Sequence, residues 1–404
     1  MNASADTQAA SAYDDVLYAT YAHTSAHPDR LATIAALTGV KTAPVDRCRV
    51  LEIGCGSGGN LIPMAAALPD STFVGCDLAA QPIAAGRALA TKLGLTNLSL
   101  QQLDLREMPP PPAPFDYVIA HGVYSWIPED ARSALLALVA RDLAPRGIAF
   151  VSYNALPGCH VRRMAWEILR FHVAGIAGPR ARLAEARALI ALIADPANRQ
   201  QSGNLALREE FRELAARSDG ALFHDDLAEV NEPFYFHEFA AAAHARGLRF
   251  LGEAEFTMMA DADVAPAVRA AVAGMDVLAR EQYLDFVRGR RFRQSLLCRA
   301  TLHPDRELDP SRLTGMSVVA PKLVSDRGLV FPAAAPDSEA FAPAADGLDD
   351  ARAIVNAITA AWPRAVSVRD LARTCRAQLP AAADDGSVPR RLAEILVGAY
   401  GAGA

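Results

Sequence analysis

Short apolar runs alternate with longer amphipathic stretches over residues 49–154. Runs rich in β-branched and bulky apolar residues predict buried parallel strands, and the stretches between them predict helices. The predicted strands are Val50–Ile53, Thr72–Asp77, Leu98–Leu105, Phe115–Gly122 and Gly147–Asn154. The predicted helices are Leu61–Leu68, Gln81–Leu93 and Pro128–Leu143. This alternation predicts an α/β fold with a doubly wound parallel sheet, whose ligands bind beyond the carboxyl ends of the strands.

The pattern changes after Asn154, where apolar positions follow helical spacing. Helices are predicted at Val161–Val173, Pro179–Ile193, Leu205–Ala216 and Glu238–Ala245. Two more strands are predicted at Gly247–Glu253 and Arg291–Arg299, and we expect the last to be antiparallel. A proline- and alanine-rich stretch follows, with one short predicted strand at Gly328–Phe331. The tail is predicted to form helices at Ala351–Trp362, Leu371–Leu379 and Val388–Tyr400.

A chain of 404 residues is too long for one ordinary core and is expected to hold several domains. In chain order, we expect a lead-in (1–30), a ligand-binding core (31–154), a helical insertion (155–230), a return to the sheet (231–300), a linker (301–345) and a small helical domain of winged-helix size (346–404). The lead-in is rich in tyrosine and histidine. It is interpreted either as a cap packed over the core or as a lid that closes on a bound ligand.

Composition narrows the class of protein. With 51% hydrophobic and 21% charged residues and a formal net charge of -6, the chain is globular and is not an overall basic nucleic-acid binder. Its six cysteines form no C-x-x-C pair, which argues against a zinc site and a disulfide framework. The sequence shows no secretory signal and no apolar run of about 18 residues, so we expect a cytoplasmic protein.

A glycine cluster follows the first predicted strand, at Gly54, Gly56, Gly58 and Gly59. Glycine lets the backbone turn sharply and approach a ligand without interference from a Cβ atom. The first, second and fourth of these glycines also satisfy the G-x-G-x-x-G fingerprint of NAD enzymes. The glycines therefore predict a nucleotide-like ligand and leave its identity open.

Acidic residues around this turn narrow the choice of ligand. Glu52 precedes the glycines, and Asp77 and Asp104 close the second and third predicted strands. A dinucleotide enzyme explains Asp77, which lies about 20 residues beyond the glycines, but it does not explain Asp104. As a set, the residues resemble the cofactor site of class I S-adenosylmethionine-dependent methyltransferases.

This resemblance implies a role for each residue of the set. Gly54, Gly56 and Gly58 would lie against the methionine part of the cofactor. Asp77 would take both ribose hydroxyls, and Asp104 with Leu105 would meet the adenine. Glu52 and His121 complete the expected cofactor-binding residues. We interpret His121 as a stacking or structural residue in preference to a catalytic base, since no partner for it is visible in the sequence.

Four longer segments extend the resemblance beyond the class. They are His121–Pro128, Ser152–His160, Val230–Phe239 and Glu281–Phe286. They resemble bacterial methyltransferases that carry a methyltransferase regulatory domain, a family that includes the rickettsial lysine methyltransferases of outer-membrane protein. The likeness covers roughly residues 13–300. Weaker similarity reaches an incomplete winged-helix-like domain in the tail. The family resemblance as a whole implies a Rossmann-like seven-stranded sheet with a regulatory-type helical insertion.

The same resemblance implies methyl transfer from S-adenosylmethionine to a protein, on lysine side-chain nitrogen. Two alternatives stay open: a small-molecule methyltransferase, in which the insertion would act as a lid, and a cofactor-binding scaffold without catalysis. We expect a protein substrate, no nucleic acid and no membrane insertion, and a homodimer is left open. No metal is expected, because displacement at a sulfonium needs only a positioned acceptor and the exclusion of water.

The expected acceptor residues follow the fourth and fifth predicted strands. Tyr124, Trp126, Tyr153 and Asn154 could form an aromatic slot with polar orienting groups, or the aromatic residues could cap the core. The pair His237 and Glu238 is interpreted as a packing or capping pair at a helix start.

A basic run, Arg288–Arg293, precedes the last predicted strand. We interpret it as a solvated turn. The alternative is a docking patch for an acidic partner.

Overall fold

A computed structural model describes residues 20–195, 205–259, 264–305, 310–319, 323–325, 328–330 and 364–376, with isolated residues between 354 and 396. The described chain forms two compact units. The first contains the residues up to Ala32 together with 42–254 and 275–302, and the second contains 33–41, 255–274 and the residues from His303 onward. Each unit is described by itself.

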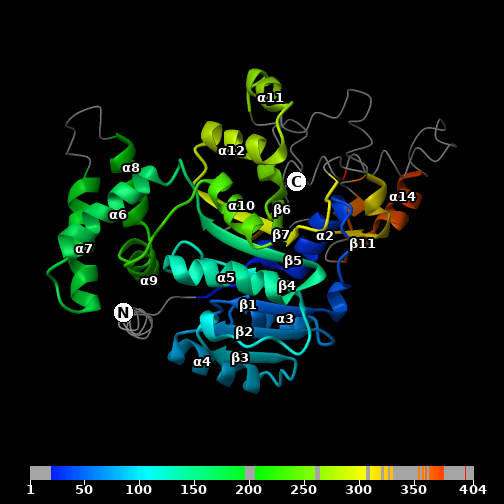
Figure 1. Cartoon of the computed structure of the whole chain (residues 1–404), viewed down its shortest axis with the longest axis horizontal. Coiled ribbons are helices and arrows are strands. Elements are labelled where there is room, and N and C mark those ends of the chain that lie inside the picture. Colours follow the sequence, from blue (N-terminus) through cyan, green and yellow to red (C-terminus); the bar gives the residue numbers. More distant parts are fainter. Residues whose placement is uncertain are drawn as a thin grey trace. The chain divides into compact units, whose positions relative to one another are not determined.

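The first unit is built on a seven-stranded sheet in the order β3-β2-β1-β4-β5-β7-β6 (Figure 1). Its strands are β1 (Arg49–Ile53), β2 (Thr72–Asp77), β3 (Leu98–Gln102), β4 (Phe115–Ala120), β5 (Leu143–Asn154), β6 (Leu248–Glu253) and β7 (Phe292–Arg299). The first five pair in parallel, whereas β7 runs antiparallel to both β5 and β6. The predicted α/β fold and the antiparallel last strand are confirmed.

Helices pack on this sheet and supply its core. They are α3 (Leu61–Ala67), α4 (Ala80–Lys92), α5 (Glu129–Asp142) and α10 (Phe236–Ala245). Helix α12 (Val277–Arg288) contacts α10, and α2 (Pro28–Leu37) begins in the first unit. One hydrophobic cluster joins Val118 of β4 and Val151 of β5 to Leu135 of α5 and Phe239 of α10. Burial of these apolar side chains holds the strands in register, and so fixes the strand ends where a ligand is expected.

The predicted helical insertion has a core of its own. Helices α6 (His160–Val173), α7 (Pro179–Ala194) and α8 (Leu205–Ala215) contact one another (Figure 1, green). A short helix, α9 (Asp219–Ala221), and a π-helical turn (Leu222–Asp226) follow. The cluster that these elements bury includes Leu169, Ile190, Phe211 and Phe223.

The interpretation of the basic run as a solvated turn is wrong, and so is its alternative as a docking patch. Arg293 is fully buried and donates to Glu253 at 2.6 Å, to Asp285 at 2.8 Å and to Glu281 at 3.2 Å. Its neighbours are engaged too: Arg290 pairs with Asp285 at 2.8 Å, and Arg291 pairs with Glu210 at 2.6 Å and Glu213 at 2.9 Å. These arginines hold β7 to α12, β6 and α8.

The interpretation of His237 and Glu238 as a packing and capping pair is confirmed. Glu238 accepts from the backbone N–H of Tyr235 at 3.1 Å at the start of α10. The backbone N–H of His237 donates to Gln282 of α12 at 3.1 Å, and its Nδ1 lies 2.9 Å from the same oxygen. Two segments that carried the family resemblance are therefore bonded to each other.

The described part of the second unit does not confirm the predicted winged-helix-like domain. Its described elements are the helices α11 (Pro266–Val272) and α14 (Val368–Arg376), the 3-10 turns Phe256–Met259 and Pro310–Gly315, and the short strands β8 (Ser317–Val318), β9 (Leu323–Ser325), β10 (Gly328–Val330) and β11 (Val366–Ser367). The strands pair as β8 with β11 and β9 with β10. Ser367 caps α14 by accepting from the backbone N–H of Asp370 at 3.0 Å. The helix predicted at Val388–Tyr400 lies almost wholly outside the described residues.

In the described part of the chain, none of the helices is long and apolar enough to cross a membrane. None of its histidine, cysteine and carboxylate side chains gather in a group of three that could hold a metal ion.

Candidate functional site

The glycine turn after β1 has a backbone that only glycine adopts readily. Gly54, Gly56 and Gly58 have φ angles of +72°, +52° and +75°, in the left-handed region. A Cβ atom on Gly54 would lie 2.5 Å from the side chain of Val123, and one on Gly56 would lie 2.7 Å from that of Thr20. Substitution would therefore strain the backbone and force neighbouring groups apart.

Asp77 fastens the glycine turn to the end of β2. Its Oδ2 accepts from the backbone N–H of Gly56 at 2.8 Å, and its Oδ1 accepts from that of Ala79 at 2.9 Å. Burial raises the pKa of this carboxyl, and the backbone hydrogen bonds oppose the rise. Each oxygen keeps lone-pair capacity for a further donor, as contact with a ribose would need.

Glu52 lies beneath the turn and is 3% exposed. Its Oε1 accepts from the side-chain amide of Asn60 at 2.9 Å, whereas its Oε2 is buried and accepts from no donor among the described residues. Burial, partly offset by the Asn60 hydrogen bond, raises the pKa of Glu52 to about 8. A buried carboxyl oxygen without a donor fits a ligand that brings an N–H or O–H group.

The described end of the lead-in packs directly on the turn. Thr20 Oγ1 lies 2.7 Å from Ser57 Oγ, and the backbone N–H of His23 donates to Asn60 at 2.9 Å. The ring of His23 stacks on that of His121 with centroids 3.7 Å apart. The lead-in thus covers the turn, and Tyr13 and Tyr18 lie outside the described residues.

His121 follows β4 and stacks on Phe150 as well as on His23. Burial, with a smaller contribution from His23, lowers the pKa of His121 to about 4. The imidazole is therefore neutral near pH 7, and its described ring contacts are those of a stacking residue.

Asp104 follows β3 and is engaged by a neighbouring arginine. Its carboxylate accepts from Arg106 Nε at 3.1 and 3.0 Å, from Nη2 at 2.5 Å and from the backbone N–H at 2.8 Å. These hydrogen bonds lower the pKa of Asp104. Leu105 packs, partly buried, against the core of the sheet. An adenine amine could reach Asp104 only if Arg106 released one oxygen.

Tyr124 and Tyr153 point into the core instead of lining a slot at the strand ends. Tyr124 is 4% exposed and Tyr153 is fully buried, and both rings pack against Phe239. The hydroxyl of Tyr153 lies 3.2 Å from that of Ser295. Successive strand residues point to opposite faces, so Tyr153 and Asn154 cannot both face the site. This alternation was already visible in the sequence.

Trp126 and Asn154 are expected acceptor residues that keep unused hydrogen-bonding groups. The buried Nε1 of Trp126 donates to no acceptor in the described part of the chain. Asn154 donates from Nδ2 to Asn231 at 2.9 Å, and its backbone N–H donates to Ser125 at 2.9 Å. Its side-chain oxygen has no hydrogen bond to the described residues.

Three contributors to the site escaped the sequence analysis. Asn60, His23 and Asn231 hold Glu52, His121 and Asn154, respectively. Asn60 directly follows the glycine cluster, and Asn231 lies in a segment that carried the family resemblance. Their positions in the chain could have drawn attention to them, but their bonding partners could not be read from local pattern.

Two family models match the chain. A methyltransferase domain matches residues 50–147, and a predicted methyltransferase regulatory domain matches residues 218–299. The second match overlaps the end of the expected helical insertion and most of the return to the sheet. Asn154 lies between the two matches, and Asn231 lies within the second.

Relatives and solved structures agree with these matches. An uncharacterized protein of Rickettsia prowazekii is 33% identical over 309 residues, 76% of this chain and 56% of the relative. A second from the same organism is 31% identical over 241 residues, 59% of this chain and 96% of the relative. The structure of PKMT2 from Rickettsia typhi in complex with AdoHcy is 25% identical, with a TM-score of 0.77, over 95% of this chain and 74% of that one.

The chain spans little more than half of the first relative and nearly all of the second. The chain belongs to the class I S-adenosylmethionine-dependent methyltransferases that carry a methyltransferase regulatory domain.

Proposed function

We propose that the protein transfers the methyl group of S-adenosylmethionine to lysine side-chain nitrogen of a protein substrate. The observation that carries the proposal is the cofactor edge of the sheet, where Asp77 holds the glycine turn by backbone hydrogen bonds. The likeness to a structure titled PKMT2 supports the choice of a protein acceptor.

The residues at this edge fit the cofactor. The positive φ angles of Gly54, Gly56 and Gly58 let the backbone turn sharply beneath the methionine part. The unpartnered oxygen of Glu52 can accept from its ammonium group, and Asp77 can accept from the ribose. When bound, the cofactor supplies an electrophilic methyl group on a sulfonium.

On the adenine side, Leu105 offers an apolar contact and Asp104 an acceptor. Arg106 Nη1 already donates to Asp130 at 2.9 Å. Arg106 can therefore shift toward Asp130 when an adenine amine takes its place on Asp104. His121, stacked between His23 and Phe150, would face the cofactor as a neutral ring. A neutral ring adds no positive charge next to a sulfonium.

Acceptor positioning falls to Trp126 and Asn154, whose indole N–H and side-chain oxygen have no hydrogen-bond partner among the residues that the structure describes. Tyr124 and Tyr153 support them from the core. An attacking amine must be uncharged, and a partly desolvated site favours that form because burial disfavours the ammonium. Positioning and water exclusion then supply most of the rate enhancement.

The proposed function gives each part of the chain a role. Residues 31–154 bind the cofactor, residues 155–230 form the insertion beside the acceptor edge, and residues 231–300 complete the sheet. The lead-in (1–30) covers the cofactor. The stretch expected as a linker (301–345) contributes β8, which pairs with β11 of the tail, so we assign it together with residues 346–404 to a unit that serves protein contacts.

The test is incubation of the full chain with methyl-labelled S-adenosylmethionine and a bacterial lysate. Asp77→Ala serves as the variant unable to hold cofactor. We expect label in protein bands and, after acid hydrolysis, in methyl-lysine. Label confined to small molecules would move the function to the small-molecule alternative. Cofactor binding without any transferred label would support the scaffold.

A further inference from the structure

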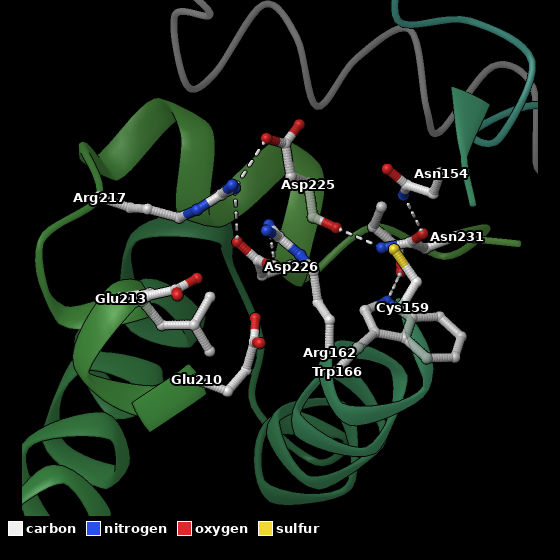
Figure 2. Close-up of polar contacts among 12 residues, drawn as sticks. Asn154, Cys159, Arg162, Trp166, Glu210, Glu213, Arg217, Asp225, Asp226 and Asn231 are labelled. Carbon is white, nitrogen blue, oxygen red and sulfur yellow. Dashed lines mark hydrogen bonds and ion pairs between the residues drawn. The ribbon is translucent and has the colours of Figure 1, made fainter. Parts of the chain in front are cut away.

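A chain of two side-chain amides joins the end of β5 to the regulatory-domain segment. Asn154 Nδ2 donates to Asn231 Oδ1 at 2.9 Å, and Asn231 Nδ2 donates to the backbone carbonyl of Asp225 at 2.9 Å (Figure 2). Asp225 and Asn231 lie inside the regulatory-domain match, and Asn154 lies at the expected acceptor edge. The regulatory-domain match is therefore bonded to the end of β5, a few residues beyond the methyltransferase match.

The direction of these hydrogen bonds is forced by chemistry. A backbone carbonyl can only accept, so Asn231 must turn its NH₂ group toward Asp225. Its oxygen then faces Asn154, which must donate with its own NH₂ group. The oxygen of Asn154 is left facing away from Asn231, as Figure 2 shows. The free group at the acceptor edge is thus a hydrogen-bond acceptor and not a donor.

The carbonyl that sets this direction is held in place from two sides. Arg217 donates to Asp225 at 2.9 Å and to Asp226 at 3.1 Å, and Arg162 of α6 donates to Asp226 at 2.7 Å (Figure 2). Asp226 is 1% exposed. Trp166 of α6 donates to the backbone carbonyl of Ala228 at 3.0 Å. Buried charge-assisted hydrogen bonds of this kind fix the segment between the π-helical turn and Asn231.

Asn154 itself has little freedom. Its backbone N–H donates to the fully buried Ser125, and its carbonyl accepts from the backbone N–H of Phe234 at 2.9 Å. Ser125 also accepts, through its carbonyl, from the backbone N–H of Glu232 at 2.9 Å. The loop after β4, the end of β5 and the segment 231–234 are therefore one bonded unit.

We infer that the side-chain oxygen of Asn154 accepts a hydrogen bond from the methyl acceptor, and that Asn231 is the positioning residue that aims it. The inference rests on the proposed function and sharpens it: the acceptor must present an N–H group, as a lysine amine does. A carboxylate has no hydrogen to donate, and its oxygens would be repelled by the side-chain oxygen of Asn154.

The step proceeds as follows. The lysine ammonium first loses one proton to water, and one remaining N–H donates to the Asn154 oxygen. The nitrogen lone pair forms the N–CH₃ bond while the electrons of the S–CH₃ bond return to sulfur, giving S-adenosylhomocysteine. The methylated nitrogen then releases its extra proton to water. The hydrogen bond to Asn154 turns the lone pair toward the methyl group.

The test uses the full chain, labelled S-adenosylmethionine and a pool of degenerate peptides built around one lysine. A matched pool carries glutamate in place of lysine. Variants are Asn154→Ala, Asn231→Ala and the double variant. Asn97→Ala is the structural control, because Asn97 also loses side-chain hydrogen bonds to backbone, at the carbonyls of Ala65, Leu68 and Ser71.

We expect kcat/KM on the lysine pool to fall about 10- to 100-fold in each single variant. This is the loss of rate expected when the methyl acceptor is misplaced. The double variant should be no slower than either single variant, since Asn231 acts only through Asn154. Cofactor Kd should stay within about twofold in all three. Asn97→Ala should lower the melting temperature and leave kcat/KM on the lysine pool within about twofold.

Three outcomes overturn the inference alone while lysine label persists: full activity of Asn231→Ala, additive losses in the double variant, or a parallel loss of cofactor binding. Label on the glutamate pool, or on neither pool, overturns it together with the lysine acceptor. As a further check, Asn154→Asp in the Asn231→Ala background presents an accepting oxygen in either orientation of its side chain, so it does not need Asn231 to aim it. It should recover activity over the double alanine variant, and failure to do so counts against the role of that oxygen.

Discussion

The carboxylates of Glu52, Asp77 and Asp104 lie around the glycine turn but have different hydrogen-bond partners. Asp77 takes two backbone hydrogen bonds and holds the turn, whereas Glu52 is almost wholly buried and has one oxygen without a donor. Asp104 is held by Arg106. Each environment shifts the carboxyl pKa in the direction that burial or hydrogen bonding dictates. Substitutions of the three residues should therefore have different measurable effects.

Asp77→Ala should weaken S-adenosylmethionine binding by at least about 100-fold, because charge-assisted hydrogen bonds contribute about 1.5–3 kcal/mol each. The loss would free Gly56 and remove the ribose acceptor together. Titration calorimetry measures it. Asp116→Ala is the matched control, since Asp116 accepts from the backbone N–H of Arg49 at 2.9 Å, where β1 begins and far from its glycine turn. Equal weakening by both variants would refute the assigned site.

Glu52 gives a pH dependence of stability with a definite sign. Its pKa in the folded protein is about 8, above the 4.5 of a free glutamate, so between these values the native state holds a proton that the unfolded state has lost. The Glu52 contribution to stability is therefore complete below about pH 4.5 and is lost as pH rises through 8. Glu52→Gln stays neutral and removes this loss. Urea unfolding at pH 5 and pH 8 should show the variant gaining stability relative to wild type at the higher pH. An unchanged difference between the two pH values would mean that Glu52 is ionised in the fold.

At the scale of elements, the sequence located the strands well and the side-chain partners poorly. β2 begins and ends where predicted, because a short apolar run closed by an acid is a local signal. The surroundings of Arg293 are not local: its carboxylates come from β6 and α12, as far as 40 residues away in sequence. A run of arginines next to a strand looks exposed until its partners are known. Tyr153 shows the opposite case: we expected it in the acceptor slot, although strand alternation, which is a local signal, indicates that it cannot face the site together with Asn154.

The buried arginine predicts a large stability effect in one element. Arg293→Leu would leave Glu253, Glu281 and Asp285 buried without their shared cation, and breaking such a network typically costs about 3–5 kcal/mol. Arg212→Ala breaks an exposed pair with Glu209 at 2.9 Å in α8 and should cost about 0.5 kcal/mol or less. Urea midpoints of the two variants provide the comparison. Similar small losses would mean that carboxyl protonation compensates for the missing arginine.

At the scale of the whole chain, the methyltransferase and regulatory matches are not separate bodies. The regulatory match supplies β6, α12 and β7, which complete the sheet, and it contains Asn231, which is bonded to the end of β5. The match boundaries in sequence therefore do not coincide with the compact units, since residues 218–254 and 275–299 belong to the first unit and 255–274 to the second. A ligand bound at the glycine turn acts on a sheet to which both matches contribute strands.

This organisation predicts where ligand binding changes hydrogen exchange. Saturating S-adenosylhomocysteine at 100 times Kd stabilises the folded state by about 2.7 kcal/mol, and exchange should slow in the elements that hold the ligand. We expect protection in residues 49–60 and 72–79, which form the turn and its anchor, and in residues 20–23, whose Thr20 and His23 lie over it. Residues 310–319 and 364–376 belong to the second unit and should exchange as before. Asp77→Ala, incubated with the same ligand, should show no gain in protection.

Protection of the turn without protection of residues 20–23 would identify the lead-in as a cap that stays unchanged on binding. Protection of both would favour a lid, because a lid that closes on the ligand must lose backbone motion when the ligand is present.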